Sequence, residues 1–329
     1  MKSRELITYV GKKKGIHDHR LIKALEKYVD VSEIYLEDRK SFPLSTKEFL
    51  KSSLVLAGPL IETLEAIPLD LRAPIIGISH ASDVNIDFPN STKLHYLERY
   101  EAIICDCNYV RDSLISNYQF THPIHVVPYG CDFDFFSSVK INYAGNPRIL
   151  VTRNWYKNYN NSLVLDAICR MNSSLKELKC TFIGDGPLLR DSIDLYKFPE
   201  NNPAISFLGK RSSEEIAIEM SKNWIYISAS STDGSSVSLL EAMAAGMVCI
   251  VTDFPSNLEW ITDGVNGFTF TNGDLESLVR LINKVSAFSI DRRHEIGALA
   301  RRKVLECGDW KLNQNDFVSK VLSFVSRPF

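Results

Sequence analysis

Two carboxylates bracket a short polar loop in the second half of the chain. Asp233 begins the loop Asp-Gly-Ser-Ser, and Glu241 stands eight residues later. The residues after Ser236 have the apolar spacing of a helix, which Gly246 ends before a run of strand-forming residues. A helix that starts in such a loop directs backbone N–H groups and the positive end of its dipole at one place. The segment therefore predicts an anion site with acids beside it, which suits a phosphate ester that carries hydroxyl groups, such as a nucleotide sugar.

Arg153 stands where a second binding group is expected. It follows the strand-like residues 148–152 and precedes a loop that leads to a helix. A guanidinium at this place can clamp a diphosphate by two parallel hydrogen bonds, and a surface salt bridge is the alternative interpretation. Gly184 and Gly186 form a strand-to-helix turn that lets the backbone approach a ligand closely, although such turns also occur for structural reasons alone.

Candidates in the first half carry a weaker signal. The loop 11–15 contains three lysines and precedes the first expected helix, where a Rossmann-like domain binds its ligand. It either meets an acceptor phosphate or an anionic membrane surface, or it is a solvated turn. Gly15 and His17 are acceptor-side candidates at this loop. His80 follows the expected strand 74–78, where it either faces a ligand or makes a local hydrogen bond.

Alternating strand-like and helix-like segments must position these residues. The alternation lapses between residues 129 and 147 into Gly, Asp, Ser, Asn and Pro, which marks a domain boundary. Strands that alternate with helices imply parallel α/β sheets, whose ligand sites lie at the carboxyl ends of the strands. We therefore expect two Rossmann-like, doubly wound domains that face a cleft, at residues 1–145 and 146–309. A C-terminal helix, residues 310–329, is expected to cross back to the first domain.

Composition excludes several other classes of protein. A length of 329 residues favours two domains, and a net charge of −2 lacks the basic excess of a nucleic-acid binder. The longest uncharged apolar run, Ala242–Val251, is too short to span a bilayer, and the first ten residues lack the apolar stretch of a secretory signal. Seven scattered cysteines without a CxxC pair favour a reducing, cytoplasmic setting.

Four blocks of sequence resemble one known family. The block from Asp233 to Gly246, with its Leu-Leu-Glu-Ala-Met-Ala core, is similar to the donor-binding motif of the retaining glycosyltransferases of family 4. Residues 126–136 resemble the interdomain segment of that family, and residues 182–187 and 207–209 resemble strand ends of its nucleotide domain. The resemblance extends from about residue 126 to residue 270. It implies the GT-B fold, in which an N-terminal acceptor-side domain and a C-terminal nucleotide-sugar-binding domain are both Rossmann-like.

The resemblance also implies roles for individual residues. Glu241 would accept hydrogen bonds from the ribose hydroxyls, and Asp233 would hold hydroxyls of the donor sugar. Arg153 would bind the diphosphate, and either Lys157 or Tyr159 would occupy the second diphosphate-contact position. The remaining implied positions are the loop and strand-end contacts to the donor and a histidine beside the transferred sugar: Gly234, Ser235, Ser236, Gly184, Gly186, Lys210 and His80.

These features together predict a metal-independent sugar transferase. The expected reaction moves a sugar from a UDP-sugar, or from GDP-mannose as the alternative, to a hydroxyl of a glycan or glycolipid in the synthesis of cell-surface polysaccharide or glycoconjugate. The resemblance implies that the reaction retains the configuration of the sugar. No metal or cofactor is expected, because Asp132 and Asp134 lie in the interdomain segment and no other cluster has ligand spacing. Two alternatives stay open: a nucleotide-sugar 2-epimerase of the same fold and a non-catalytic nucleotide-sugar binder. No nucleic-acid partner is expected, and contact of the N-terminal domain with the inner membrane face is left open.

Overall fold

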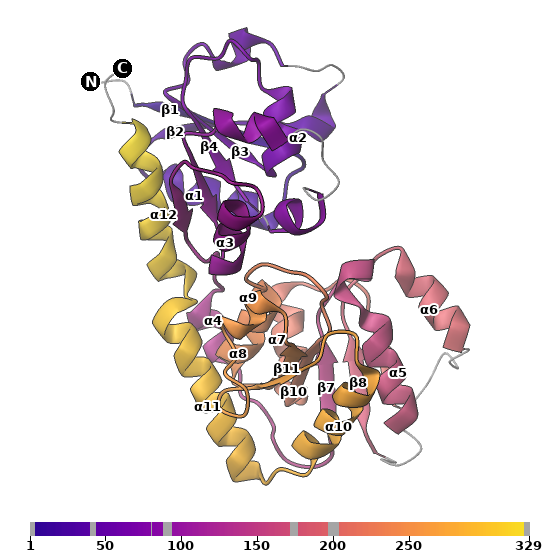
Figure 1. Ribbon diagram of the computed structural model, residues 1–329. Helices are drawn as coiled ribbons and strands as arrows, with labels where there is room; N and C mark the ends of the chain where they lie inside the picture. The colour runs from indigo at the N-terminus through magenta and orange to yellow at the C-terminus, as the bar shows by residue number, and fades with distance from the viewer. Residues whose placement is uncertain are drawn as a thin grey trace. The chain divides into compact units, whose positions relative to one another are not determined.

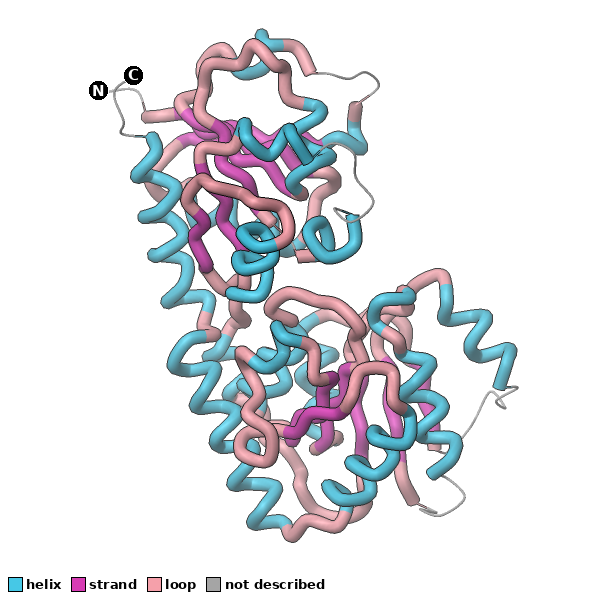
Figure 2. The backbone as a smooth tube through the Cα atoms, viewed as in Figure 1, coloured by secondary structure: helices cyan, strands magenta, loops and turns pink. Residues whose placement is uncertain are grey.

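The chain forms two compact units, each built on a parallel sheet. The computed structural model describes residues 4–39, 44–79, 81–87, 94–171, 177–196 and 204–325. The first unit comprises Met1–Tyr129 together with Lys311–Phe329, and the second comprises Gly130–Trp310. Figure 1 follows the chain through the two units by colour, and Figure 2 shows that helices and strands alternate along most of it.

The first unit has a six-stranded sheet in the order β2-β1-β3-β4-β5-β6, in which every described pair is parallel. Its principal elements are β1 (Leu6–Gly11), α1 (Ile16–Leu25), β2 (Asp30–Tyr35), β3 (Leu54–Gly58), α2 (Leu60–Ala66), β4 (Ile75–Ile78), β5 (Ala102–Cys105), α3 (Asn108–Ser116), β6 (Ile124–Val126) and α12 (Trp310–Val325). Short helical turns lie at Leu36–Asp38, Thr46–Phe49, Asp83–Asp87 and Leu94–Arg99. The strand order reverses between β1 and β3, the place where doubly wound sheets bind ligands.

The second unit has a six-stranded parallel sheet in the order β12-β11-β10-β7-β8-β9. Its elements are α4 (Phe133–Ser137), β7 (Arg148–Val151), η6 (Lys157–Tyr159), α5 (Asn161–Met171), β8 (Lys179–Phe182), α6 (Leu188–Tyr196), β9 (Ile205–Phe207), α7 (Ser213–Lys222), β10 (Ile225–Ser228), α8 (Val237–Ala245), β11 (Val248–Thr252), α9 (Pro255–Leu258), β12 (Phe268–Phe270), α10 (Leu275–Ser286) and α11 (Ile290–Cys307). Here the reversal lies between β7 and β10.

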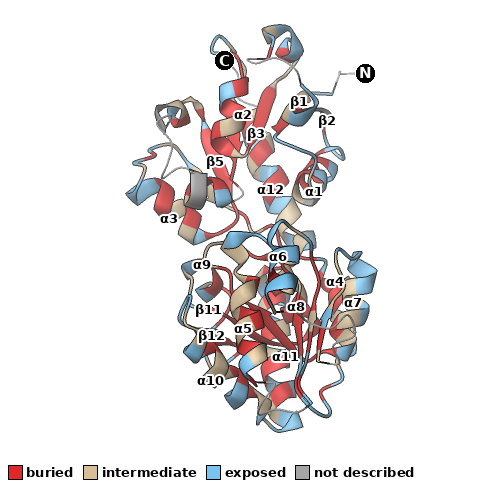
Figure 3. Ribbon diagram, turned by 90° about the vertical axis from the view of Figure 1, so that its right-hand side faces the viewer, coloured by how far each residue is buried: buried red, intermediate tan, exposed pale blue. Residues whose placement is uncertain are grey.

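Apolar cores cover both faces of the second sheet. Because side chains alternate along a strand, Ile149 and Ile227 belong to one core, whereas Leu150 and Tyr226 belong to the other. Figure 3 shows the buried strands between helices that are exposed on their outer sides. Strands buried on both faces read as continuous apolar runs, which is why these segments lack a polar-apolar alternation.

The boundary between the units lies at Gly130, earlier than the predicted position at residue 145. The reason is α4, whose Phe133 and Phe136 pack in the same core as Leu239 of α8. The segment that reads as an irregular linker thus starts with a short helix anchored in the second unit.

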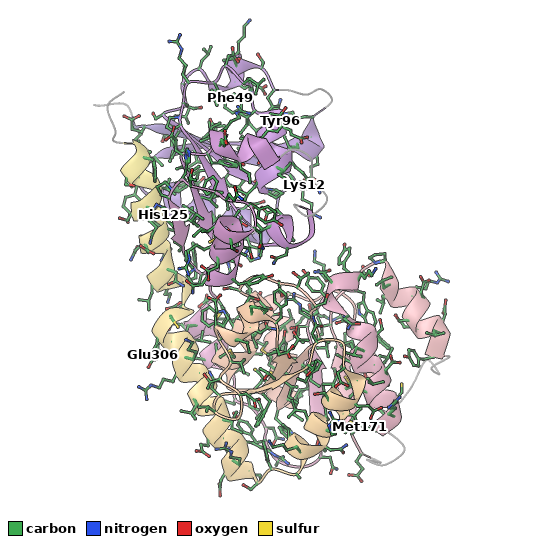
Figure 4. The ribbon with its side chains drawn as sticks, viewed as in Figure 1. Lys12, Phe49, Tyr96, His125, Met171 and Glu306 are labelled. Carbon is green, nitrogen blue, oxygen red and sulfur yellow. The ribbon has the colours of Figure 1, made fainter. Side chains whose placement is uncertain are left out.

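The last helix belongs to the first unit. On α12, Phe317, Val321 and Phe324 are buried, at spacings of about one helical turn. The ring of Phe324 lies 6.2 Å from the ring of His125 on β6, and Figure 4 shows His125 beside this helix. Asn313 donates to the carbonyl of Pro128 at 3.0 Å. Among the residues described, no helix has both the length and the apolar character needed to cross a membrane.

Candidate active site

The candidate site lies at the topological switch point of the second unit. Arg153 follows β7, and the loop that contains Asp233 follows β10, so two neighbouring strands deliver them to the same edge of the sheet. That loop leads into α8, whose N-cap residue is Ser236. The sheet topology therefore explains how residues eighty positions apart meet.

Arg153 is the centre of the cluster. Its Nη1 donates to the hydroxyl oxygens of Ser236 at 2.8 Å and Ser238 at 3.0 Å, and its Nη2 forms an ion pair with Asp233. Burial alone would lower the pKa of Arg153, but the carboxylate of Asp233, together with the nearby Tyr159 and Tyr226, more than offsets that effect, so the pKa lies above its ordinary value. The guanidinium is therefore a fixed positive charge at the start of α8.

Asp233 is held from several sides. Its Oδ1 accepts from the backbone N–H of Gly234 at 3.1 Å, and its carbonyl accepts from the hydroxyl of Ser256 at 3.2 Å. Burial raises the pKa of Asp233, and Arg153 offsets part of that rise. The neighbouring Ser235 is buried and accepts from the indole N–H of Trp260 at 3.3 Å. The Asp-Gly-Ser-Ser loop is thus a tethered structure.

The N-terminus of α8 keeps its anion-binding potential. Ser236 is the N-cap, but its side chain makes no capping hydrogen bond to the helix and turns to Arg153 instead. The first-turn amides of α8 are therefore not capped by this side chain. Glu241 is half-buried one turn beyond Ser238 on the same side of α8, because residues three apart are neighbours on a helix.

Lys157 and Tyr159, the two residues expected at the second diphosphate contact, lie in different surroundings. The guanidinium carbon of Arg153 lies 4.0 Å from the centre of the Tyr159 ring, within cation–π range. Lys157 is exposed at the start of η6. Tyr159 is therefore the residue that η6 brings to the cluster.

Gly184 and Gly186 pack against the chain itself. A Cβ atom at Gly184 would lie 2.5 Å from the carbonyl oxygen of Arg153, and one at Gly186 would lie 2.6 Å from that of Trp155. Both glycines have a positive φ, and Trp155 donates its backbone N–H to Asp185 at 2.9 Å. This turn between β8 and α6 thus packs directly against the backbone of Arg153 and Trp155. Lys210 is exposed in the loop after β9, next to Gly209.

The acceptor-side candidates lie in the first unit. Gly15 is the N-cap of α1, and its N–H donates to Asp18 at 3.1 Å. The ring of His17 lies 5.3 Å from that of Tyr129. His80 lies outside the residues that the structure describes.

An open pocket of about 450 Å³ lies at the reversal between β1 and β3. Its lining includes Lys12, which Figure 4 labels, and Glu62, and these two side chains pair at 2.8 Å. Lys14 approaches Glu33 at 3.5 Å, so two of the three loop lysines have carboxylate partners. The remaining lining residues are Lys13, Leu36, Glu37, Glu65 and Ala66.

The sequence did not indicate that three residues of the cluster belong to the site. Ser238 and Trp260 lie in segments that read as helix and core, and Tyr226 lies in a buried strand. A tyrosine inside an apolar strand was the available signal, because a buried phenol needs a hydrogen-bond partner. Within the described part of the chain, no group of three or more His, Cys, Asp or Glu side chains is placed to hold a metal ion.

Two doubly wound units, with an arginine and a helix N-terminus at the switch point of the second, define an α/β enzyme of the GT-B glycosyltransferase fold. The family of Glycosyl transferases group 1 matches residues 132–303, more than half of the chain, and the chain belongs to it. It is therefore a glycosyltransferase. No curated protein matches the sequence significantly.

Several solved structures share the fold over nearly the whole chain. A glycosyltransferase from Rickettsia africae has a TM-score of 0.74 at 17% identity, with 100% of both chains covered. Anabaena HepE, solved with UDP-glucose, has a TM-score of 0.77 at 15% identity over 97% of this chain and 99% of its own. Sucrose-phosphate synthase from Thermosynechococcus elongatus has a TM-score of 0.76 at 13% identity over 97% and 99%. At these identities the likeness establishes the fold.

Proposed function

We propose that this enzyme transfers a sugar from a nucleoside-diphosphate sugar to a hydroxyl of a glycan or glycolipid, with retention of configuration, as a member of glycosyltransferase family 4. The observation that carries the proposal is the contact of Arg153 with Ser236 and Ser238 at the start of α8. A UDP-sugar is the favoured donor because similar folds were solved with UDP and UDP-glucose. GDP-mannose is the alternative donor.

The leaving group determines what the protein has to supply. Negative charge grows on the diphosphate as the glycosidic bond breaks, and a preorganised hydrogen-bond donor at such a charge contributes about 3 kcal/mol. Arg153 and the amides of α8 would provide that stabilisation without a metal ion or other cofactor. Asp233 would orient hydroxyls of the sugar, and Glu241 would accept hydrogen bonds from the ribose. The sugar would pass through an oxocarbenium-like state, as in glycoside hydrolysis.

For the acceptor, we propose the pocket at the reversal between β1 and β3 of the first unit. Its carboxylates, Glu62 and Glu65 among them, are suited to accept hydrogen bonds from sugar hydroxyls. An anionic membrane surface is a weaker candidate for binding to the loop 11–15, because Lys12 and Lys14 already pair with carboxylates. A role at the cytoplasmic face of the membrane, in cell-surface polysaccharide or glycoconjugate synthesis, fits such acceptors.

A donor screen followed by a ribose test examines the proposal. UDP-, GDP- and ADP-sugars are compared by thermal shift, since a ligand that binds only the folded state raises its stability by mass action. Calorimetry with UDP and with 2′-deoxy-UDP then compares the wild type with Glu241→Gln. We expect the variant to lose the preference for the ribonucleotide. Glu276→Gln, an exposed carboxylate that pairs with Arg170 in the same unit, serves as the control.

The outcome also separates the alternatives. Isomerised donor in the absence of acceptor would indicate a 2-epimerase, and binding without turnover across a panel of glycan acceptors would indicate a non-catalytic binder. Retention is read from the anomeric configuration of the product by NMR. A chain that binds no nucleotide sugar would contradict the proposal.

A further inference from the structure

A chain of three hydroxyl groups runs from the sheet of the second unit to the guanidinium of Arg153, which pairs with Asp233. The phenol of Tyr226, on β10, lies 2.9 Å from the hydroxyl of Ser238. Ser238 lies 3.2 Å from the hydroxyl of Ser236. Arg153 donates to both serines from one nitrogen, Nη1. Tyr226 is fully buried, so this chain starts inside the core.

The hydrogen bonds from Arg153 have a fixed direction. A guanidinium only donates, so each of the two serine oxygens accepts one hydrogen bond from Nη1 and keeps its own proton for another partner. The phenol of Tyr226 lies 2.9 Å from Ser238, and Ser238 lies 3.2 Å from Ser236. The three hydroxyl groups and the guanidinium therefore form one connected hydrogen-bond network.

We propose that Tyr226 and Ser238 are positioning residues that fix Arg153 and Asp233 for the donor diphosphate, an assignment that rests on the proposed function. Neither side chain needs to touch the donor. Tyr226 hydrogen-bonds Ser238, and Ser238 contacts both the guanidinium and Ser236. The orientation of Arg153 is therefore set by β10, the strand that carries Tyr226. Burial raises the pKa of Tyr226 to about 12, which keeps its proton on the phenol at neutral pH.

This chain of hydroxyl groups predicts that a change at Tyr226 or Ser238 affects the binding of UDP differently from the binding of uridine. Arg153 would contact the phosphates, so a misplaced guanidinium weakens the binding of UDP and leaves the binding of uridine unchanged. A merely structural role would weaken both or only lower the melting temperature. The ratio of the two affinities is therefore the informative measurement.

The central experiment compares Ser238→Thr with Ser238→Val. The two new side chains have nearly the same shape, and only threonine keeps the hydroxyl. We expect Ser238→Thr to bind UDP like the wild type and Ser238→Val to bind it roughly tenfold more weakly or worse, because a hydrogen bond to a charged group is lost. Calorimetry measures the binding of UDP, and NMR titration measures that of uridine. Equal UDP affinities for the two variants would overturn the assignment.

Tyr226→Phe tests the hydrogen bond between Tyr226 and Ser238. We expect a several-fold loss of UDP affinity, smaller than that of Ser238→Val, since Ser238 keeps its contact with Arg153. Tyr100→Phe is the control, because Tyr100 is equally buried and donates to a backbone carbonyl in the other unit. If both phenylalanine variants bind UDP like the wild type, Tyr226 has no positioning role. Should the wild type bind neither UDP nor GDP, the proposed function itself fails.

Discussion

At Arg153 a single guanidinium connects three parts of the second unit. It follows β7, contacts two serines at the start of α8 and pairs with the loop that follows β10. Its ring neighbour Tyr159 covers one face at 4.0 Å. A planar group with five donors can make these contacts at once, whereas a point charge on a flexible stem cannot.

Arg153→Lys should therefore impair transfer even though it keeps the charge. We expect the rate of sugar transfer to fall by about 100-fold, the typical loss when one preorganised donor is removed from a developing anion. Initial rates with saturating acceptor measure the effect, and circular dichroism checks the fold. Arg170→Lys, in an exposed ion pair, should retain full activity. A fully active Arg153→Lys enzyme would exclude the bidentate role.

Among the elements, the turn between β8 and α6 supports the site through the backbone. Gly184 has φ +133° and donates its N–H to the carbonyl of Gly209 at 2.9 Å, and the next residue, Asp185, accepts from the N–H of Trp155 at 2.9 Å. The turn thus fixes the position of the backbone after β7, which includes Arg153. Its glycines are required by the close approach of the two backbone segments.

Gly184→Ala should destabilise the second unit more than Gly209→Ala. Gly209 also has a positive φ, but a Cβ there meets nothing within 4 Å, so its substitution carries only the left-handed strain of about 1–2 kcal/mol. At Gly184 the new methyl would lie 2.5 Å from a carbonyl oxygen, which adds an overlap cost of about 1–3 kcal/mol. Urea denaturation measures both variants. Equal losses of stability would show that the segment of Arg153 moves aside at little cost.

Docking of α12 on β6 should depend on pH through His125. Burial lowers the pKa of His125, the nearby Lys320 lowers it further, and Asp316 opposes both. The unfolded chain then binds more protons than the folded chain once the pH falls below the ordinary histidine pKa of about 6.5. We therefore expect the stability of the first unit to fall as the pH drops through that value. Denaturation curves of the wild type and His125→Gln between about pH 8 and pH 5 should diverge at low pH, and parallel curves would contradict the assignment.

On the scale of the whole molecule, the chain leaves the first unit at Tyr129 and re-enters it at Lys311. The first unit is completed by α12, whose buried residues include Phe317, Val321 and Phe324. Each fully buried apolar side chain of this size contributes about 1.5–3 kcal/mol. The contribution of this helix is thus comparable to the stability of a domain, about 5–15 kcal/mol.

A chain that ends at Trp310 should consequently lose the first unit and keep donor binding. We expect differential scanning calorimetry to show the loss of one transition, with UDP still raising the temperature of the other. Transfer to an acceptor should be abolished. Leu312→Ala, at an exposed position of α12, should behave like the wild type. A truncated chain with two intact transitions would contradict the role of α12.

The sequence by itself determined the fold and the centre of the site. Alternating strands and helices are local patterns, so the α/β architecture could be predicted, as could the Asp233 loop and the helix after it. The GT-B fold was implied by the resemblance to a known family. The predicted boundary was less accurate, because α4 is anchored by contacts with α8 that leave no local signal.

Only the tertiary structure decided how the site is held together. Which of Lys157 and Tyr159 lies against Arg153 depended on where η6 directs a side chain, and spacing along the chain does not determine that. The roles of Gly184 and Gly186 depended on which backbone lies opposite them. Tyr226 and Ser238, twelve residues apart, meet because α8 packs against the strand that precedes it, β10. Arg153 reaches Ser238 only because β7 and β10 are neighbours in the sheet, and spacing along the chain does not determine that order of strands.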